Sequence, residues 1–289
     1  MLRRRGSWVT TMTSRICASM EHDERLLAES IASAANQRCS LSLGVTLTVG
    51  EYLVAAPLAR YVATHPDMDV RIEQNGTEVL LARLRAGEID CALIEGYFDK
   101  RDLAWRVFSR QELVAVRAAG APRPQQAGAP ADSRAMVGDA RACGHASGAE
   151  RARKFASGGA LAREPEPSGP ASFEDLLSCH ILVREPGSGT RAVLEHALAE
   201  SNLTLESFAR VTEVSSLNII KAFVAEGVGI SFLYEAAVRD EIESGVLERL
   251  PLAVGPIEHD ITFVRLKGGA FAGRMERFFD ELMLCAAGA

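Results

Sequence analysis

The chain has 289 residues, 47% of which are hydrophobic, and this length and composition suit one or two domains with modest cores. Its net charge of -6 argues against nonspecific nucleic-acid binding by the body of the chain. No apolar run approaches the length of a membrane span, and none follows the basic start Arg3-Arg4-Arg5 as it would in a signal peptide. We therefore expect a cytoplasmic protein with no membrane association.

Residues 1–40 precede the first predicted strand. Apolar residues recur there at helical spacing, with charged side chains between them, at Met20, Leu27, Ile31 and Ala34. This pattern predicts a helix, and no helix-turn-helix pattern accompanies it.

Four short apolar strands each run into the start of a helix that carries polar side chains. The strands and the residues that follow them are 41–45 with Thr46 and Thr48, 69–73 with Asn75 and Thr77, 181–183 with Arg184, Ser188, Gly189 and Thr190, and 210–214 with Ser215 and Ser216. Alternating strands and helices predict an α/β fold with a parallel sheet, and ligands bind outside the carboxyl ends of such strands. Because the units fall into two pairs, we expect two lobes that face one cleft.

The third of these units is the most informative. A Pro/Gly turn follows its strand, and an amphipathic helix then begins with Val193 and Leu194 on its apolar face. The free N–H groups and the dipole at such a helix start favour a bound anion. Ser188 and Thr190 either cap the helix or hold the oxygens of a ligand. Arg184 is a ligand clamp or an inter-lobe partner, or else a solvated strand end or a salt-bridge partner in the neighbourhood of Glu185. The recurrence of the same construction favours a small polar or anionic ligand.

The stretch 118–170 differs in composition from the rest of the chain. It is rich in Ala, Gly, Pro, Arg and Ser, and it contains few large apolar residues. Such a segment cannot bury enough apolar surface to offset the entropy lost on ordering. We therefore expect a disordered insertion on the surface.

The cysteines and histidines do not form a metal-binding pattern. Cys143 and His145 are close in sequence, but they lie within the stretch 118–170. Cys91 is expected in the core, and Cys179 could act as a redox sensor only if it were exposed and its pKa lowered. Because the sequence also lacks a nucleophile elbow, a metalloprotease helix motif and a P-loop lysine, we expect no cofactor, no metal and no catalytic residues.

Several stretches, in order and at suitable spacing, resemble the effector-binding domain of LysR-type transcriptional regulators. They are 44–60 with Gly50-Glu51-Tyr52-Leu53, 65–67, 75–79, 84–96 with Ala92-Leu93-Ile94-Glu95-Gly96, 184–191, 225–233 and 243–247. The likeness covers roughly residues 41–116 and 172–284. It implies two Rossmann-like lobes, similar to type II periplasmic binding proteins, that sense a metabolite in the cleft. It also implies homodimers or homotetramers that form through these lobes.

A complete regulator of this kind begins with a winged helix-turn-helix and a long linker helix. No helix-turn-helix pattern is evident before residue 41, so we expect DNA contact only through a module not evident in this chain. The stretch 118–170 is also much longer than the short connection expected at that point of the family's fold.

These observations predict a segment 1–40, a lobe I of 41–113 plus 249–289, and a lobe II of 114–248 that contains the insertion. We expect hinges near Leu113 and Leu250. The predicted function is to sense a small anionic metabolite. The predicted effector-binding residues are Thr46, Thr48, Asn75, Thr77, Arg184, Ser188, Gly189, Thr190, Ser215 and Ser216. The alternative is a solute-binding protein of similar fold that delivers a small anion to a transporter.

Overall fold

The computed structural model describes residues 39–121, 169–268 and 272–287. The helix predicted within 1–40 and most of the predicted insertion lie outside these ranges, as do Cys143 and His145. Both expectations therefore stay predictions. The first strand begins at Cys39, two residues before the predicted start.

One mixed sheet runs through the described residues in the order β2-β1-β3-β9-β4-β7-β5-β6, with β8 beside β4. The strands are β1 (Cys39–Val45), β2 (Met68–Gln74), β3 (Cys91–Ile94), β4 (Leu103–Ala118), β5 (His180–Val183), β6 (Arg210–Glu213), β7 (Ile230–Tyr234), β8 (Leu247–Leu250) and β9 (Ile257–Leu266). Strand β1 is parallel to β2 and β3, and β5 is parallel to β6 and β7, as alternating strands and helices predict. Strands β4 and β9 are antiparallel because they carry the chain from one lobe to the other and back.

Helices connect most of these strands, and the apolar face predicted for α6 is buried. They are η1 (Val49–Val54), α2 (Ala55–Thr64), α3 (Thr77–Arg85), α5 (Phe173–Leu176), α6 (Gly189–Glu200), η2 (Leu205–Ser207), α7 (Leu217–Ala225), α8 (Glu235–Glu243) and α9 (Ala272–Ala287). The apolar stripe of α6, which includes Val193 and Leu194, packs into the core as its spacing predicts. Within the described residues, none of the helices has the length and apolar character needed to cross a membrane.

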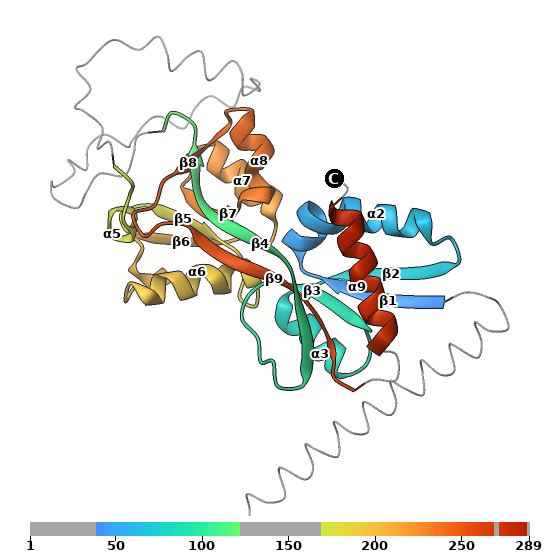
Figure 1. The fold of residues 1–289 in the computed structure, drawn as a ribbon. Coiled ribbons are helices and arrows are strands. Elements are labelled where there is room, and N and C mark those ends of the chain that lie inside the picture. Colours follow the sequence, from blue (N-terminus) through green and yellow to red (C-terminus); the bar gives the residue numbers. More distant parts are fainter. Residues whose placement is uncertain (1–38, 122–168, 269–271, 288–289) are drawn as a thin grey trace, which may run out of the picture.

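Figure 1 shows two lobes that the long strands β4 and β9 join. Lobe I contains β1, β2, β3, α2, α3 and α9, and lobe II contains β5 to β8 and α5 to α8. The predicted hinge residue Leu113 lies within β4, whose register with β9 shifts between Val107 and Ser109. Leu250 instead ends β8, which pairs with β4 in lobe II. We therefore propose that the return crossover lies in β9, later than the predicted boundary at residue 249.

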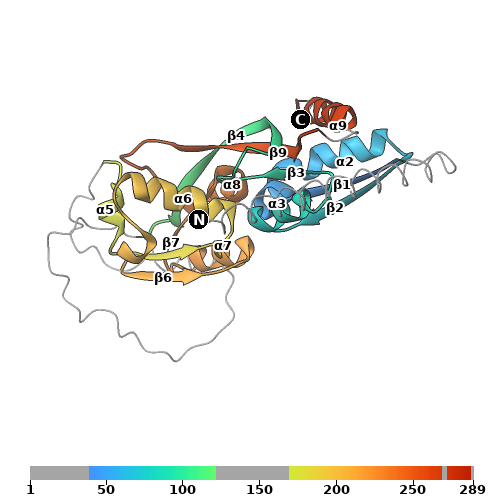
Figure 2. The same cartoon turned by 90° about the horizontal axis from the view of Figure 1, so that it is seen from below.

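Each lobe buries apolar side chains on both faces of its part of the sheet. In β3, Cys91 and Leu93 belong to the core that α2 and α9 cover, whereas Ala92 and Ile94 pack with residues of α3. Figure 2 shows α2 and α9 together on one side of this part of the sheet. Cys91 is fully buried, as predicted. The β strands are thus fixed from both sides, which holds their carboxyl ends, and the polar residues that follow, in place.

Candidate effector site

The carboxyl ends of strands from the two lobes meet around a pocket of about 240 Å³. We call it the inner pocket; its lining residues are Thr46, Leu47, Gln74, Asn75, Gly76, Glu95, Arg184, Glu185, Ser188, Gly189 and Ser215. Six of the ten predicted effector-binding residues are among them. A smaller pocket of about 190 Å³ shares Glu95, Ser188 and Gly189 with it. The strand-to-helix pattern therefore located the place where both lobes contribute polar groups.

Three buried donors of the inner pocket have no hydrogen-bond partner among the described residues. They are Ser188 Oγ, Thr46 Oγ1 and Arg184 Nη1. Their residues are 4%, 2% and 5% exposed, so bulk water reaches them poorly. Ser188 is the N-cap residue of α6, yet its side chain makes no capping hydrogen bond. A buried polar group without a partner costs free energy, and an anion with several oxygens would supply the missing acceptors.

Two arginines lie near the start of α6, and only one of them lines the inner pocket. The Nε and Nη2 atoms of Arg184 donate to Glu185 at 2.8 and 2.9 Å, which leaves Nη1 for a ligand. Arg191 instead donates to Glu195 and Glu213, both at 2.7 Å, and it lies outside the inner pocket. Arg184 is therefore the arginine placed to contact a ligand there.

Three predicted threonines are bound to Glu95 and do not line the inner pocket. Thr190 Oγ1 and Thr48 Oγ1 donate to Glu95 Oε1 at 3.0 and 3.4 Å. Thr77 Oγ1 donates to the backbone carbonyl of Glu95 at 2.7 Å. Ser216 also lies outside the pocket, and its Oγ caps α7 by accepting from the N–H of Ile219.

Glu95 is the functional candidate that the sequence reasoning missed. Its side chain is 1% exposed and lies directly after β3, at the same sheet edge as the predicted residues. Burial raises the pKa of the Glu95 carboxyl to about 7, although the hydrogen bond from Thr190 and the charge of Arg184 oppose this rise. The sequence does contain a signal for Glu95, because this charged residue directly follows an apolar strand, as Arg184 does.

The lobes touch closely beside this carboxylate. A Cβ atom added to Gly189 would lie 2.5 Å from the backbone oxygen of Glu95, so only glycine allows the approach. Gly96 has a φ of +86°, and a Cβ atom added to it would lie 2.9 Å from the Cα of Gly189. Further along the same interface, the hydroxyl of Tyr52 in lobe I donates to Asn218 Oδ1 in lobe II at 3.3 Å. The structure therefore has the two lobes in direct contact around the inner pocket.

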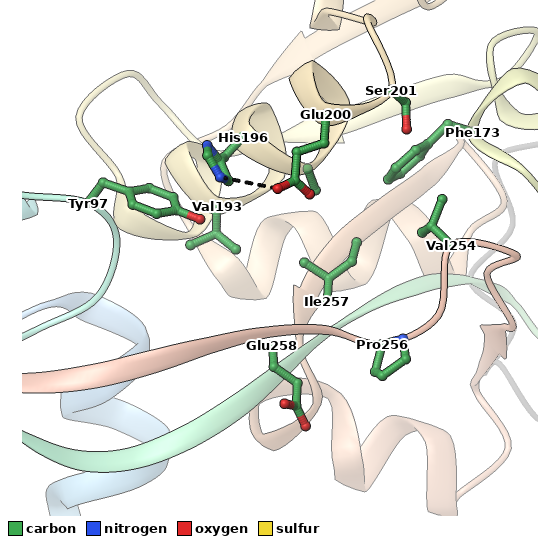
Figure 3. A pocket seen from close by; sticks show the side chains of 11 residues that line it. Tyr97, Phe173, Val193, His196, Glu200, Ser201, Val254, Pro256, Ile257 and Glu258 are labelled. Carbon is green, nitrogen blue, oxygen red and sulfur yellow. Dashed lines mark ion pairs between the residues drawn. The ribbon is translucent and has the colours of Figure 1, made fainter.

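A second pocket, of about 350 Å³, lies along the flank of α6 (Figure 3). We call it the outer pocket; its lining residues are Tyr97, Phe173, Val193, His196, Ala197, Glu200, Ser201, Val254, Pro256, Ile257 and Glu258. His196 packs on Tyr97 with ring centroids 4.4 Å apart, and its Nε2 lies 3.6 Å from Glu200. None of these lining residues is Arg or Lys, and two are acidic. The outer pocket therefore lacks the charge that an anion requires.

Cys179 and Cys91 do not meet the conditions for a redox sensor. Burial raises the pKa of the Cys179 thiol, which lowers the fraction of reactive thiolate. Burial also raises the pKa of Cys91, which lies in the core. Among the described residues, no group of three or more His, Cys, Asp or Glu side chains is placed to hold a metal ion.

The family model described as "LysR substrate binding domain" matches residues 34–141 and 145–284, which is most of the chain. The chain belongs to this family. This LysR substrate-binding domain is 20% identical to a solved structure described as the regulatory domain of CcmR from Synechocystis PCC6803 in complex with 2-PG. The TM-score is 0.62, and the match covers 86% of this chain and 98% of that one. The predicted α/β fold with two lobes is thereby confirmed.

Two curated relatives also match this LysR substrate-binding domain. The phosphonates import ATP-binding protein PhnC of Anaeromyxobacter dehalogenans (strain 2CP-C) is 26% identical over 206 residues, which are 71% of this chain and 33% of that protein. The uncharacterized HTH-type transcriptional regulator YeiE of Escherichia coli (strain K12) is 21% identical over 233 residues, 81% of this chain and 64% of that protein. The chain thus spans between a third and two thirds of the length of these relatives.

Proposed function

We propose that the chain senses a small anionic metabolite in the inner pocket and acts as the effector-binding domain of a LysR-type transcriptional regulator in the cytoplasm. The observation that carries this proposal is the set of buried donors without partners, Ser188 Oγ, Thr46 Oγ1 and Arg184 Nη1. They surround the start of α6, where free N–H groups and the helix dipole favour negative charge. Family membership supports a sensing role over delivery of a solute to a transporter.

The chemistry of the relatives guides the choice of ligands to test. The similar CcmR domain is described in complex with 2-PG, which is 2-phosphoglycolate, and the PhnC relative is named for phosphonates. Both names concern small anions with several oxygens, which suit the group of donors in the inner pocket. We therefore select phosphate, sulfate, phosphonates, 2-phosphoglycolate and short carboxylates as the test panel.

A thermal-shift screen of the purified chain tests the proposal. A ligand at 100 times its Kd should stabilise the folded chain by roughly 2.7 kcal/mol, and the Arg184→Gln variant should lose most of that shift. Neutral amides and sugars of similar size serve as the comparison set. A melting temperature that rises with neutral compounds and with none of the anions would contradict an anion-binding pocket.

The proposal includes assembly into a homodimer or homotetramer. Strands β2 and β6 end the sheet on its two sides within the described residues, so both present an edge to a partner. Exposed apolar side chains lie on or beside these edges, at Ile72 in β2 and at Ile219 and Phe223 in α7. Phe223→Glu should lower the molar mass measured by light scattering after gel filtration. DNA contact in this assembly belongs to a helix-turn-helix module that the described residues do not include.

A further inference from the structure

We propose that Glu95 determines which ligands the inner pocket accepts, and that an anion binds there together with a proton that the Glu95 carboxylate takes up. This inference rests on the proposed function. According to this proposal, the ionised carboxylate of Glu95 excludes anions from the inner pocket, and the neutral acid admits them.

The carboxylate of Glu95 occupies donors at the start of α6 that an anion would approach. Its Oε1 accepts from Thr190, the second residue of α6, across the lobe interface, and from Thr48 within lobe I. Its Oε2 has no hydrogen-bond partner among the described residues. An ionised Oε2 has nothing to donate to a bound anion, whereas a protonated one offers a hydrogen bond.

The charges around Glu95 favour uptake of a proton by its carboxylate when an anion binds. Arg184 is the one cation that lines the inner pocket, and it already binds Glu185, so an ionised Glu95 leaves the lining with two carboxylates and one guanidinium. A dianion added to this set would meet net repulsion in a buried site, and protonation of Glu95 relieves it.

The other titratable groups near Glu95 do not change this balance. They are Tyr234 at the end of β7, and Glu78, Tyr97, Arg191 and Glu195 around the smaller pocket. Arg191 is paired with two glutamates and so adds no free positive charge. Burial raises the pKa values of Tyr234 and Tyr97, so both side chains stay neutral near pH 7. Because the pKa of Glu95 is already raised to about 7 by burial, its proton exchanges in the physiological range.

Isothermal titration calorimetry of the full chain with sulfate tests the inference, because sulfate keeps its double charge throughout the range used. Titrations at pH 6 and pH 8, each in two buffers of different ionisation enthalpy, give the Kd and the number of protons taken up. We expect the Kd to rise about tenfold from pH 6 to pH 8. We also expect an uptake of nearly one proton at pH 8 and of less than about 0.2 at pH 6.

Two variants sharpen this experiment. Glu95→Gln keeps the shape but not the charge, so it should bind sulfate at both pH values about as tightly as the wild-type chain does at pH 6, with no proton uptake. Glu78→Gln removes an exposed carboxylate from the neighbouring pocket and should keep the wild-type pH dependence.

The outcomes separate this inference from the proposed function. Equal sulfate affinity at pH 6 and pH 8 with no proton uptake overturns the role of Glu95 and leaves the anion pocket intact. Absence of sulfate binding in both the wild-type chain and Glu95→Gln overturns the anion pocket, and both proposals with it. The number of protons that the wild-type chain takes up on binding sulfate tests the role of Glu95 even if the Glu95→Gln chain does not fold.

Discussion

The inner and outer pockets lie along the same helix, α6, and yet they differ in charge. The inner pocket uses the first turn, where Ser188 and Gly189 stand beside Arg184, and the outer pocket uses the flank, with His196 and Glu200. Backbone N–H groups are free in the first turn and bonded within the helix beyond it, so only the helix start offers backbone donors. The outer pocket is the larger of the two, at about 350 against 240 Å³. We propose that position along the helix, rather than size, sets the class of ligand that each pocket takes.

The largest change is expected from Gly189→Ala. The new methyl group would lie 2.5 Å from the backbone oxygen of Glu95, so the lobes must separate at the inner pocket. We expect no measurable sulfate binding and a loss of about 1–3 kcal/mol in stability, the usual cost of overpacking. Gly273→Ala in α9, where a Cβ meets nothing within 4 Å, should bind like the wild-type chain. Calorimetry measures sulfate binding by both variants, and thermal melts measure their stability. Sulfate binding by Gly189→Ala would contradict the close contact between the lobes.

Glu95→Gln should change the pH dependence of stability. The pKa of Glu95 is raised from 4.5 to about 7, so the folded state holds the proton more tightly than the unfolded chain does. The stability due to this group is therefore full below pH 4.5 and falls by about 3 kcal/mol as the pH rises through 7. The variant should lack this fall and be more stable than the wild-type chain at pH 8. Denaturant unfolding at pH 5 and pH 8 measures the difference.

Glu200→Gln in the outer pocket is the matched control for that comparison. Its side chain is 73% exposed, so removal of its charge should leave both sulfate affinity and the pH dependence of stability unchanged. If both glutamine variants altered the pH dependence equally, the effect would come from the overall charge of the chain.

Arg184→Gln should weaken anion binding by about 1.5–3 kcal/mol, the usual value of a hydrogen bond to a charged group. Arg191→Gln is its control, because Arg191 lies close by in the sequence but outside the inner pocket. Calorimetric titration with sulfate should give a Kd roughly ten to a hundred times higher for the first variant and nearly unchanged for the second. Equal losses in both would mean that the arginines act through general charge.

Thr46→Val and Thr190→Val should have smaller and different effects. Thr46 Oγ1 has no partner among the described residues, so its loss removes one bond to the ligand and costs about 1.5 kcal/mol of binding. Thr190 stabilises the ionised form of Glu95, so Thr190→Val should raise the pKa of Glu95 and shift the pH profile of binding upward. Binding titrations from pH 6 to pH 8 separate the two variants. If both showed the same pH profile of binding, the different roles given to Thr46 and Thr190 would be contradicted.

Much of the fold and part of the site follow from local patterns in the sequence. Apolar strands followed by helix starts with polar residues predicted the parallel pairing of β1 and of β5 with their neighbours. The same pattern predicted that Ser188 lies at the start of α6. These signals are local because a strand, a turn and a helix start lie within a dozen residues of each other. The two pairs of strand-to-helix units and the family resemblance both predicted the arrangement in two lobes.

The rest depends on contacts between distant parts of the chain. Thr190, Thr48 and Thr77 donate to Glu95 from 95, 47 and 18 residues away, so these hydrogen bonds have no local signal. The pairing of β4 with β9 also has no local signal, because it depends on how the lobes are joined and not on residue type.

The most direct test of an anion site at the start of α6 is a crystal of the chain soaked in selenate, which is located by its anomalous scattering. We expect a peak within about 4 Å of Ser188 Oγ and Arg184 Nη1, the distance set by hydrogen bonds to its oxygens. The same peak should be absent from crystals of Arg184→Gln. A peak in the outer pocket, with none at the start of α6, would contradict the account.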